Sequence, residues 1–101
     1  MANPKQSALV EEKFIGGHRA CAGCGFPIFL KQVLGSTSDP IVVVSATGCL
    51  EVTSTIFPFS AWKTPFLHNA FENSAATCSG IEGAWQSLKK QGKYDKNVKF
   101  L

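Results

Sequence analysis

The sequence lacks any apolar stretch long enough to cross a bilayer, since its longest β-branched run covers only residues 41–44. Charged residues also interrupt the first 20 residues, which rules out the continuous apolar segment of a secretory signal. Only 17% of the residues are charged, less than the roughly one quarter of an average soluble domain. The net charge is +3, but no interleaved basic and aromatic residues accompany it. We therefore expect a cytoplasmic protein that binds neither membranes nor nucleic acid.

A second CxxC motif is also missing. Cys21 and Cys24 form the one CxxC motif, and the other two cysteines are Cys49 and Cys78. In a reducing compartment, four thiols indicate metal binding or catalysis rather than disulfides. Cys21, Cys24 and Cys49 lie in two glycine-containing loops, and three such thiolates make a soft site for zinc or an iron–sulfur cluster. Cys78 falls in the middle of a predicted helix, where we expect a small buried hydrophobic residue.

Other interpretations of the cysteines stay open at this point. A CxxC motif at a helix N-terminus also suits a thiol–disulfide pair. The pair could instead form half of a zinc knuckle with the two remaining cysteines, although a zinc ribbon normally brings a second CxxC. A dinucleotide fingerprint is excluded, because no strand precedes Gly23 and Ile28 stands where a glycine is required.

The hydrophobic pattern predicts an α/β fold with a mostly parallel sheet. Apolar residues recur with a helical period over residues 26–34, and Gly35 is a suitable end for that helix. Residues 41–44 are β-branched without alternation, which is typical of a parallel strand covered on both faces. A small-residue loop, residues 45–49, follows at the carboxyl end of this strand, where ligands of open α/β sheets bind. Gly48 is expected to let Cys49 turn toward Cys21 and Cys24, because a side chain there would clash with a bound cluster or force a backbone angle that only glycine accepts at low cost. We expect the sulfurs of the three cysteines to converge on one site.

The rest of the chain predicts part of a larger domain. Residues 50–70 hold two prolines and several aromatic residues, so we expect an irregular segment with one helical turn, packed in the core or at a subunit interface. A helix is predicted from Asn73 or Ser74 to Gln91, and residues 97–101 begin another strand. One complete and one opening strand do not make a stable sheet. We expect an N-terminal arm, residues 1–15, and a partial α/β domain, residues 16–101.

Several motifs together resemble one family, the β subunits of pyruvate:ferredoxin oxidoreductases. The resemblance covers residues 16–101 in order and is more specific than a single CxxC motif. It rests on Gly17–Gly25 (GHRACAGCG), Ala46–Val52 (ATGCLEV), Phe57–Pro65 (FPFSAWKTP), His68, Ala70–Asn73 (AFEN), Ser79–Glu82 (SGIE) and Leu88–Gly92 (LKKQG).

The resemblance implies the N-terminal part of a thiamine-diphosphate-binding module. Such enzymes oxidatively decarboxylate a 2-oxoacid, pyruvate in the type most similar, and pass electrons through [4Fe-4S] clusters to ferredoxin. The implied cofactors are a [4Fe-4S] cluster, thiamine diphosphate and Mg²⁺. The implied partners are the other subunits, ferredoxin, the 2-oxoacid and coenzyme A. Cys21, Cys24 and Cys49 match three cluster ligands, whereas the fourth ligand and the Gly-Asp-Gly motif that holds Mg²⁺ are expected beyond residue 101.

The resemblance also suggests polar groups that face the cofactor or the substrate. His68 and Asn73 are the expected catalytic residues, and His18, Thr47 and Gly48 are the expected cofactor-binding residues. Each has a structural alternative: His68 could be a packing residue, Asn73 a helix cap, and Thr47 a support for its loop. Glu51 is expected to cap backbone N–H groups. A non-catalytic zinc- or cluster-binding module remains the alternative function.

Overall fold

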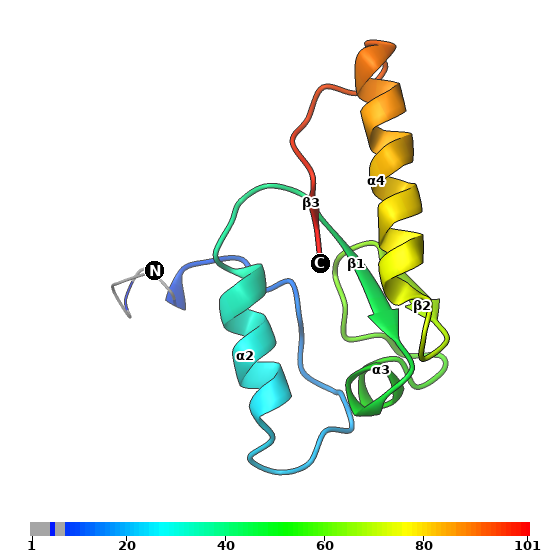
Figure 1. Ribbon diagram of the computed structural model, residues 1–101. Helices are drawn as coiled ribbons and strands as arrows, with labels where there is room; N and C mark the ends of the chain where they lie inside the picture. Colours follow the sequence, from blue (N-terminus) through cyan, green and yellow to red (C-terminus); the bar gives the residue numbers. More distant parts are fainter. Residues whose placement is uncertain (1–4, 6–7) are drawn as a thin grey trace.

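The structure is a computed structural model that describes residue 5 and residues 8–101. Its sheet contains three strands, β1 (Ile41–Ala46), β2 (Phe66–Asn69) and β3 (Lys99–Phe100). Its helices are α2 (Gly25–Leu34), α3 (Cys49–Ser54) and α4 (Ser74–Lys90). The strands are all parallel in the order β2-β1-β3 (Figure 1), which confirms the predicted α/β class. No helix in the described part of the chain is long and apolar enough to cross a membrane.

The carboxyl ends of β1 and β2 lie together at one edge of the sheet. After β1 the chain passes through α3 to β2 on one side, and α4 then returns it to β3 on the other side. In the register of the β1–β2 pair, Ser45 lies opposite His68 and Ala46 lies opposite Asn69. Because both strands run parallel, their carboxyl ends lie side by side. The residues that follow β1 therefore meet the last residues of β2.

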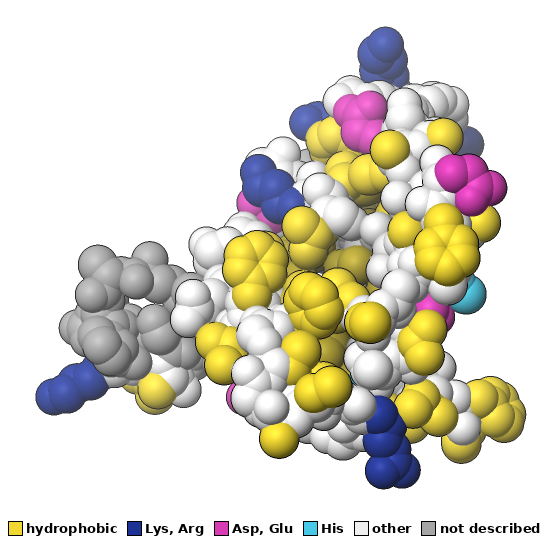
Figure 2. Space-filling model, turned by 60° about the horizontal axis from the view of Figure 1, so that its bottom comes forward, with side chains coloured by type: hydrophobic (Ala, Val, Ile, Leu, Met, Phe, Trp, Pro, Cys, Tyr) yellow, Lys and Arg dark blue, Asp and Glu magenta, His cyan; other side chains and the backbone are white. Residues whose placement is uncertain are grey.

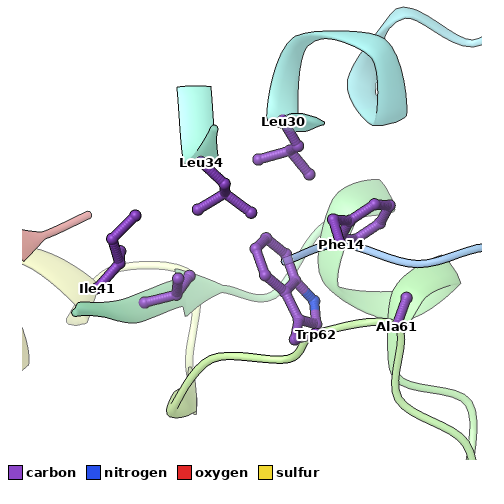
Figure 3. Packing of buried hydrophobic residues seen from close by; sticks show 7 residues of the cluster. Phe14, Leu30, Leu34, Ile41, Ala61 and Trp62 are labelled. Carbon is purple, nitrogen blue, oxygen red and sulfur yellow. The ribbon is translucent and has the colours of Figure 1, made fainter. Parts of the chain in front are cut away.

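The buried core lies between α2 and one face of β1. It consists of Phe14, Leu30, Leu34, Ile41, Val43, Ala61 and Trp62. Figure 3 shows the Trp62 ring between the side chains of Leu34 and Phe14. Phe14 meets Trp62 edge to face, with 4.9 Å between the ring centroids, a favourable aromatic geometry.

The end of the predicted N-terminal arm is part of this core. Phe14 is only 1% exposed, and it forms an isolated antiparallel bridge with Trp62. The next residue, Ile15, donates its backbone N–H to the Ala61 carbonyl at 2.8 Å. Residues 1–4 and 6–7 of the predicted arm lie outside the described residues.

The long helix α4 lies on the opposite side of β1 from α2 (Figure 1). Val42, which points away from the core, shares a groove of about 250 Å³ with Ile81, Trp85 and Leu88 of α4. Trp85 and Leu88 lie on one helix face, as predicted, but no residue of α4 is buried. This face of the sheet is therefore less completely covered than the α2 face.

Two predictions about the middle of the chain are only partly right. The strand extends to Ala46 and a helix begins at Cys49, so the loop between them is only Thr47 and Gly48. The segment expected to be irregular with one helical turn is irregular over residues 55–65 and begins with most of the short helix α3, but it ends in a strand, β2, that was not predicted. The strand forms because Val43–Ala46 offer a parallel partner for residues 66–69. The sheet therefore has three strands rather than the expected one complete strand and the beginning of a second.

Aromatic and aliphatic side chains also remain on the surface. Of the aromatic residues in the middle segment, Trp62 is buried, but Phe57 is 94% exposed and does not belong to the core. Phe26, Ile28 and Phe29 of α2 are exposed as well. Figure 2 shows hydrophobic side chains gathered on the face that lies at the bottom of Figure 1, where α2 begins and α3 lies.

Candidate functional site

The candidate site lies where β1 and β2 end and α3 begins. Figure 1 shows α3 beside the arrowhead of β1, at the carboxyl edge of the sheet. Thr47 and Gly48 make the two-residue turn, and Cys49 is the first residue of α3. Thr47 donates its backbone N–H to the Asn69 carbonyl at 2.9 Å, which ties the turn to the end of β2. The sheet therefore places the predicted Thr47, Gly48 and Cys49 at the edge where ligands bind in α/β folds.

A polar network joins three side chains across this edge. His68 Nε2 lies 2.8 Å from Thr47 Oγ1, and His68 Nδ1 lies 3.4 Å from Glu51 Oε1. The Glu51 side chain is only 9% exposed, whereas the His68 side chain is 54% exposed. Glu51 also accepts a hydrogen bond from the Thr55 hydroxyl at 3.0 Å. Glu51 therefore binds side chains rather than capping backbone N–H groups, which corrects its predicted role.

Both ring nitrogens of His68 contact other side chains. The Thr47 hydroxyl lies 2.9 Å from the Asn69 carbonyl, and while it donates there its oxygen can accept from His68 Nε2–H. The direction of the Thr47–His68 hydrogen bond depends on the tautomer of the ring. The other ring nitrogen faces the Glu51 carboxylate. Both nitrogens of His68 thus face protein partners, and the ring links Glu51 to Thr47.

Asn73 occupies the N-cap position of α4, but its side chain makes no capping hydrogen bond. Its carbonyl accepts hydrogen bonds from the Thr77 backbone N–H at 3.0 Å and the Thr77 hydroxyl at 3.1 Å. The buried Asn69, at the end of β2, accepts from the same Thr77 hydroxyl through Oδ1 at 2.6 Å. Asn69 was not foreseen from the sequence, and it connects the sheet edge to the start of α4. Asn73 is exposed, so its side chain is available to solvent or a ligand.

Gly17 shapes the segment that leads to the CxxC motif. Its φ is +98°, and an added Cβ would lie 2.9 Å from a ring carbon of Phe59. Only glycine adopts such a conformation without strain. The next residue, His18, stacks on Phe14 with 5.4 Å between centroids, and its Nδ1 accepts from the Ala20 backbone N–H at 3.3 Å. His18 is thus a packed, half-buried residue on the approach to the motif.

The CxxC loop passes close to α3. The Arg19 backbone N–H donates to the Thr53 carbonyl in α3 at 2.8 Å. The motif itself is a turn, in which Cys24 donates its N–H to the Cys21 carbonyl at 3.0 Å, and Gly23 adopts a φ of +74°. Cys24 is the N-cap residue of α2. The fold therefore brings the loop that holds Cys21 and Cys24 to the helix that begins with Cys49.

The predicted metal ligands fit an iron–sulfur cluster in their chemistry. All four cysteines are free, and Cys21 and Cys49 are exposed. Thiolates on neighbouring loops suit iron–sulfur clusters. However, in residue 5 and residues 8–101 no three His, Cys, Asp or Glu side chains lie together as ligands of one metal ion. The expected convergence of the three sulfurs is not a feature of this structure, and the ligand assignment stays a prediction. Cys78 is half-buried on α4 rather than fully buried.

Gly48 does not need to be glycine for backbone reasons. Its φ of 174° and ψ of −176° are extended, a conformation open to any residue. An added Cβ would meet no atom within 4 Å. This corrects the expectation that the turn depends on a backbone angle peculiar to glycine. The space in front of Gly48 is open, which suits close approach of a ligand.

Known proteins resemble this chain over most of its length. The pyruvate synthase subunit PorB of Thermotoga maritima is 47% identical over 97% of the chain, and that of Methanocaldococcus jannaschii is 47% identical over 90%. The chain belongs to the family of 2-oxoacid oxidoreductase β subunits. The chain is also similar to the ketoisovalerate oxidoreductase subunit VorB of Pyrococcus abyssi, which is 37% identical over 77% of the chain.

The chain spans about a third of the length of the PorB subunits it matches, 32% and 31% in the two cases above. It spans 25% of the VorB subunit. No protein-family model matches the chain.

Proposed function

We propose that the chain is part of a subunit of a thiamine-diphosphate-dependent oxidoreductase. The enzyme oxidatively decarboxylates a 2-oxoacid and passes the electrons through a [4Fe-4S] cluster to ferredoxin. The observation that carries the proposal is the 47% identity to a pyruvate synthase subunit over 97% of the chain. That name makes pyruvate the first substrate to test, and the 37% identity to a ketoisovalerate oxidoreductase subunit makes ketoisovalerate the second.

The proposed site residues of this chain are of two kinds, ligands of the iron–sulfur cluster and polar groups that face the cofactor. Cys21, Cys24 and Cys49 bind iron as thiolates, with a fourth ligand outside residues 1–101. Thiamine diphosphate with Mg²⁺ supplies the site of decarboxylation, and the cluster supplies an acceptor for single electrons. The exposed Cys21 and Cys49 suit this assignment, because their thiols are open to ligation.

The remaining assigned residues bind or orient. Thr47 presents its hydroxyl at the carboxyl edge of the sheet, and Gly48 leaves space beside it. His68 orients Thr47 at this edge, since its Nε2 contacts the Thr47 hydroxyl and its Nδ1 contacts Glu51. Asn73 offers an exposed amide at the start of α4, and His18 stiffens the loop before the CxxC motif through its contact with Phe14.

The test uses the full-length subunit assembled anaerobically with its partner subunits. We expect a brown protein that contains iron and sulfide and reduces ferredoxin when pyruvate and coenzyme A are added, with ketoisovalerate compared in parallel. Loss of reduction on removal of thiamine diphosphate and Mg²⁺ would assign the cofactors. A colourless protein with stoichiometric zinc and no 2-oxoacid oxidation would refute the proposal and favour the non-catalytic zinc module.

A further inference from the structure

One histidine contacts residues on both sides of Cys49, and its contact with Glu51 is an ion pair when the ring is protonated. Thr47 precedes Cys49 by two positions and Glu51 follows it by two. His68, on the neighbouring strand β2, lies 2.8 Å from Thr47 Oγ1 through Nε2 and 3.4 Å from Glu51 Oε1 through Nδ1. A single imidazole therefore spans the short segment that carries Cys49.

The ends of this span are themselves fixed. The Thr47 backbone N–H and hydroxyl both donate to the Asn69 carbonyl, each at 2.9 Å. At the other end, the Glu51 side chain is 9% exposed and accepts from the Thr55 hydroxyl. An exposed ion pair contributes little on its own. Here one partner is buried, and the Thr47 end has two hydrogen bonds to the Asn69 carbonyl, so both ends of the span are anchored by other residues.

We propose that Glu51, His68 and Thr47 form a clamp that positions Cys49 for metal ligation. The inference rests on the proposed function, in which Cys49 binds the cluster. His68 is then a positioning residue, because it touches Thr47 and Glu51 rather than the metal. Groups that hydrogen-bond directly to a metal ligand commonly change metal affinity or activity by about 10–100-fold when they are removed. We expect an effect at the lower end of that range, because the clamp acts on the residues beside Cys49 and not on its thiol.

The test compares shape-matched variants in the full-length subunit assembled with its partners. Thr47→Val removes the hydroxyl and keeps the side-chain shape, whereas Thr47→Ser retains the hydroxyl. His68→Phe removes both ring bonds. Thr37→Val is the matched control, because its hydroxyl accepts the Asp39 N–H in a turn before β1, away from Cys49. The measurements are hydrogen exchange of residues 45–52, the rate of iron loss to a chelator, and the EPR spectrum of the reduced cluster.

For Thr47→Val and His68→Phe we expect faster hydrogen exchange, roughly 10-fold faster iron loss and an altered EPR spectrum. Thr47→Ser and Thr37→Val should match the unmodified protein in all three. Unchanged exchange and iron loss in Thr47→Val would overturn the clamp, even if His68→Phe failed to fold. Equal effects in Thr47→Ser and Thr47→Val would also overturn it, since the hydroxyl would not matter. If the unmodified subunit contains no iron, the proposed function fails, and hydrogen exchange alone then decides whether the clamp exists.

Discussion

Replacing Gly17 with alanine should disturb the approach to the CxxC motif more than replacing its neighbour Gly16. Gly17 has a φ of +98°, and an added Cβ would lie 2.9 Å from the Phe59 ring, while a Cβ at Gly16 would meet no atom within 4 Å. A non-glycine residue in such a backbone conformation costs about 1–3 kcal/mol. Displacing the packed ring adds about 1–3 kcal/mol. We therefore expect Gly17→Ala to lower the free energy of unfolding by about 2–6 kcal/mol.

The assay is thermal unfolding of the full-length subunit, followed by circular dichroism. At roughly 2–4 °C per kcal/mol for a mid-sized domain, Gly17→Ala should lower the melting temperature by about 4–24 °C. Gly16→Ala, the matched control, should change stability by no more than about 0.5 kcal/mol. Equal melting temperatures for the two variants would refute the reasoning, because both the backbone strain and the contact with Phe59 are present only at position 17.

Three further changes test the site and its support. Cys49→Ala should abolish the cluster in the assembled enzyme, as should replacement of Cys21 or Cys24, whereas Cys78→Ala should keep it. Iron analysis of the Cys49 and Cys78 variants measures this, and iron loss only in Cys78→Ala would contradict the ligand assignment. Gly48→Ala should leave the melting temperature unchanged, because its backbone is extended and its Cβ meets no atom; a fall in cluster content in this stable variant would indicate a ligand in that space, and a fall in melting temperature would count against the structure. Trp62→Phe removes the 2.8 Å hydrogen bond from Nε1 to the buried Ser54 Oγ, so denaturant unfolding should show a loss of about 1 kcal/mol; no loss would mean that the bond contributes nothing.

The sequence alone determined the elements whose pattern is local. The period of residues 26–34 predicted α2, which runs from Gly25 to Leu34. The helix α4, Ser74–Lys90, was predicted with nearly the observed first and last residues, because a helix of 17 residues has a clear sequence pattern. The β-branched run at Ile41 predicted the central parallel strand, β1. The family was also readable, because its motifs are runs of neighbouring residues.

Only the tertiary structure decided the elements that depend on distant partners. β2 has four residues, and it is a strand because β1 pairs with it. α3 has six residues, and so short a helix is marginal without packing. Phe14 looked like part of an arm, but Trp62 and Ala61 bring it into the core.

The same distinction applies to the candidate site. Thr47 and His68 were singled out as separate polar residues, but their contact requires the β1–β2 register that sets Ser45 opposite His68. The role of Glu51 was misjudged, because its partner His68 lies 17 positions later in the chain and no spacing rule connects them. Residue identity therefore determined which side chains carry the chemistry, and the parallel pairing of two strands decided which of them meet.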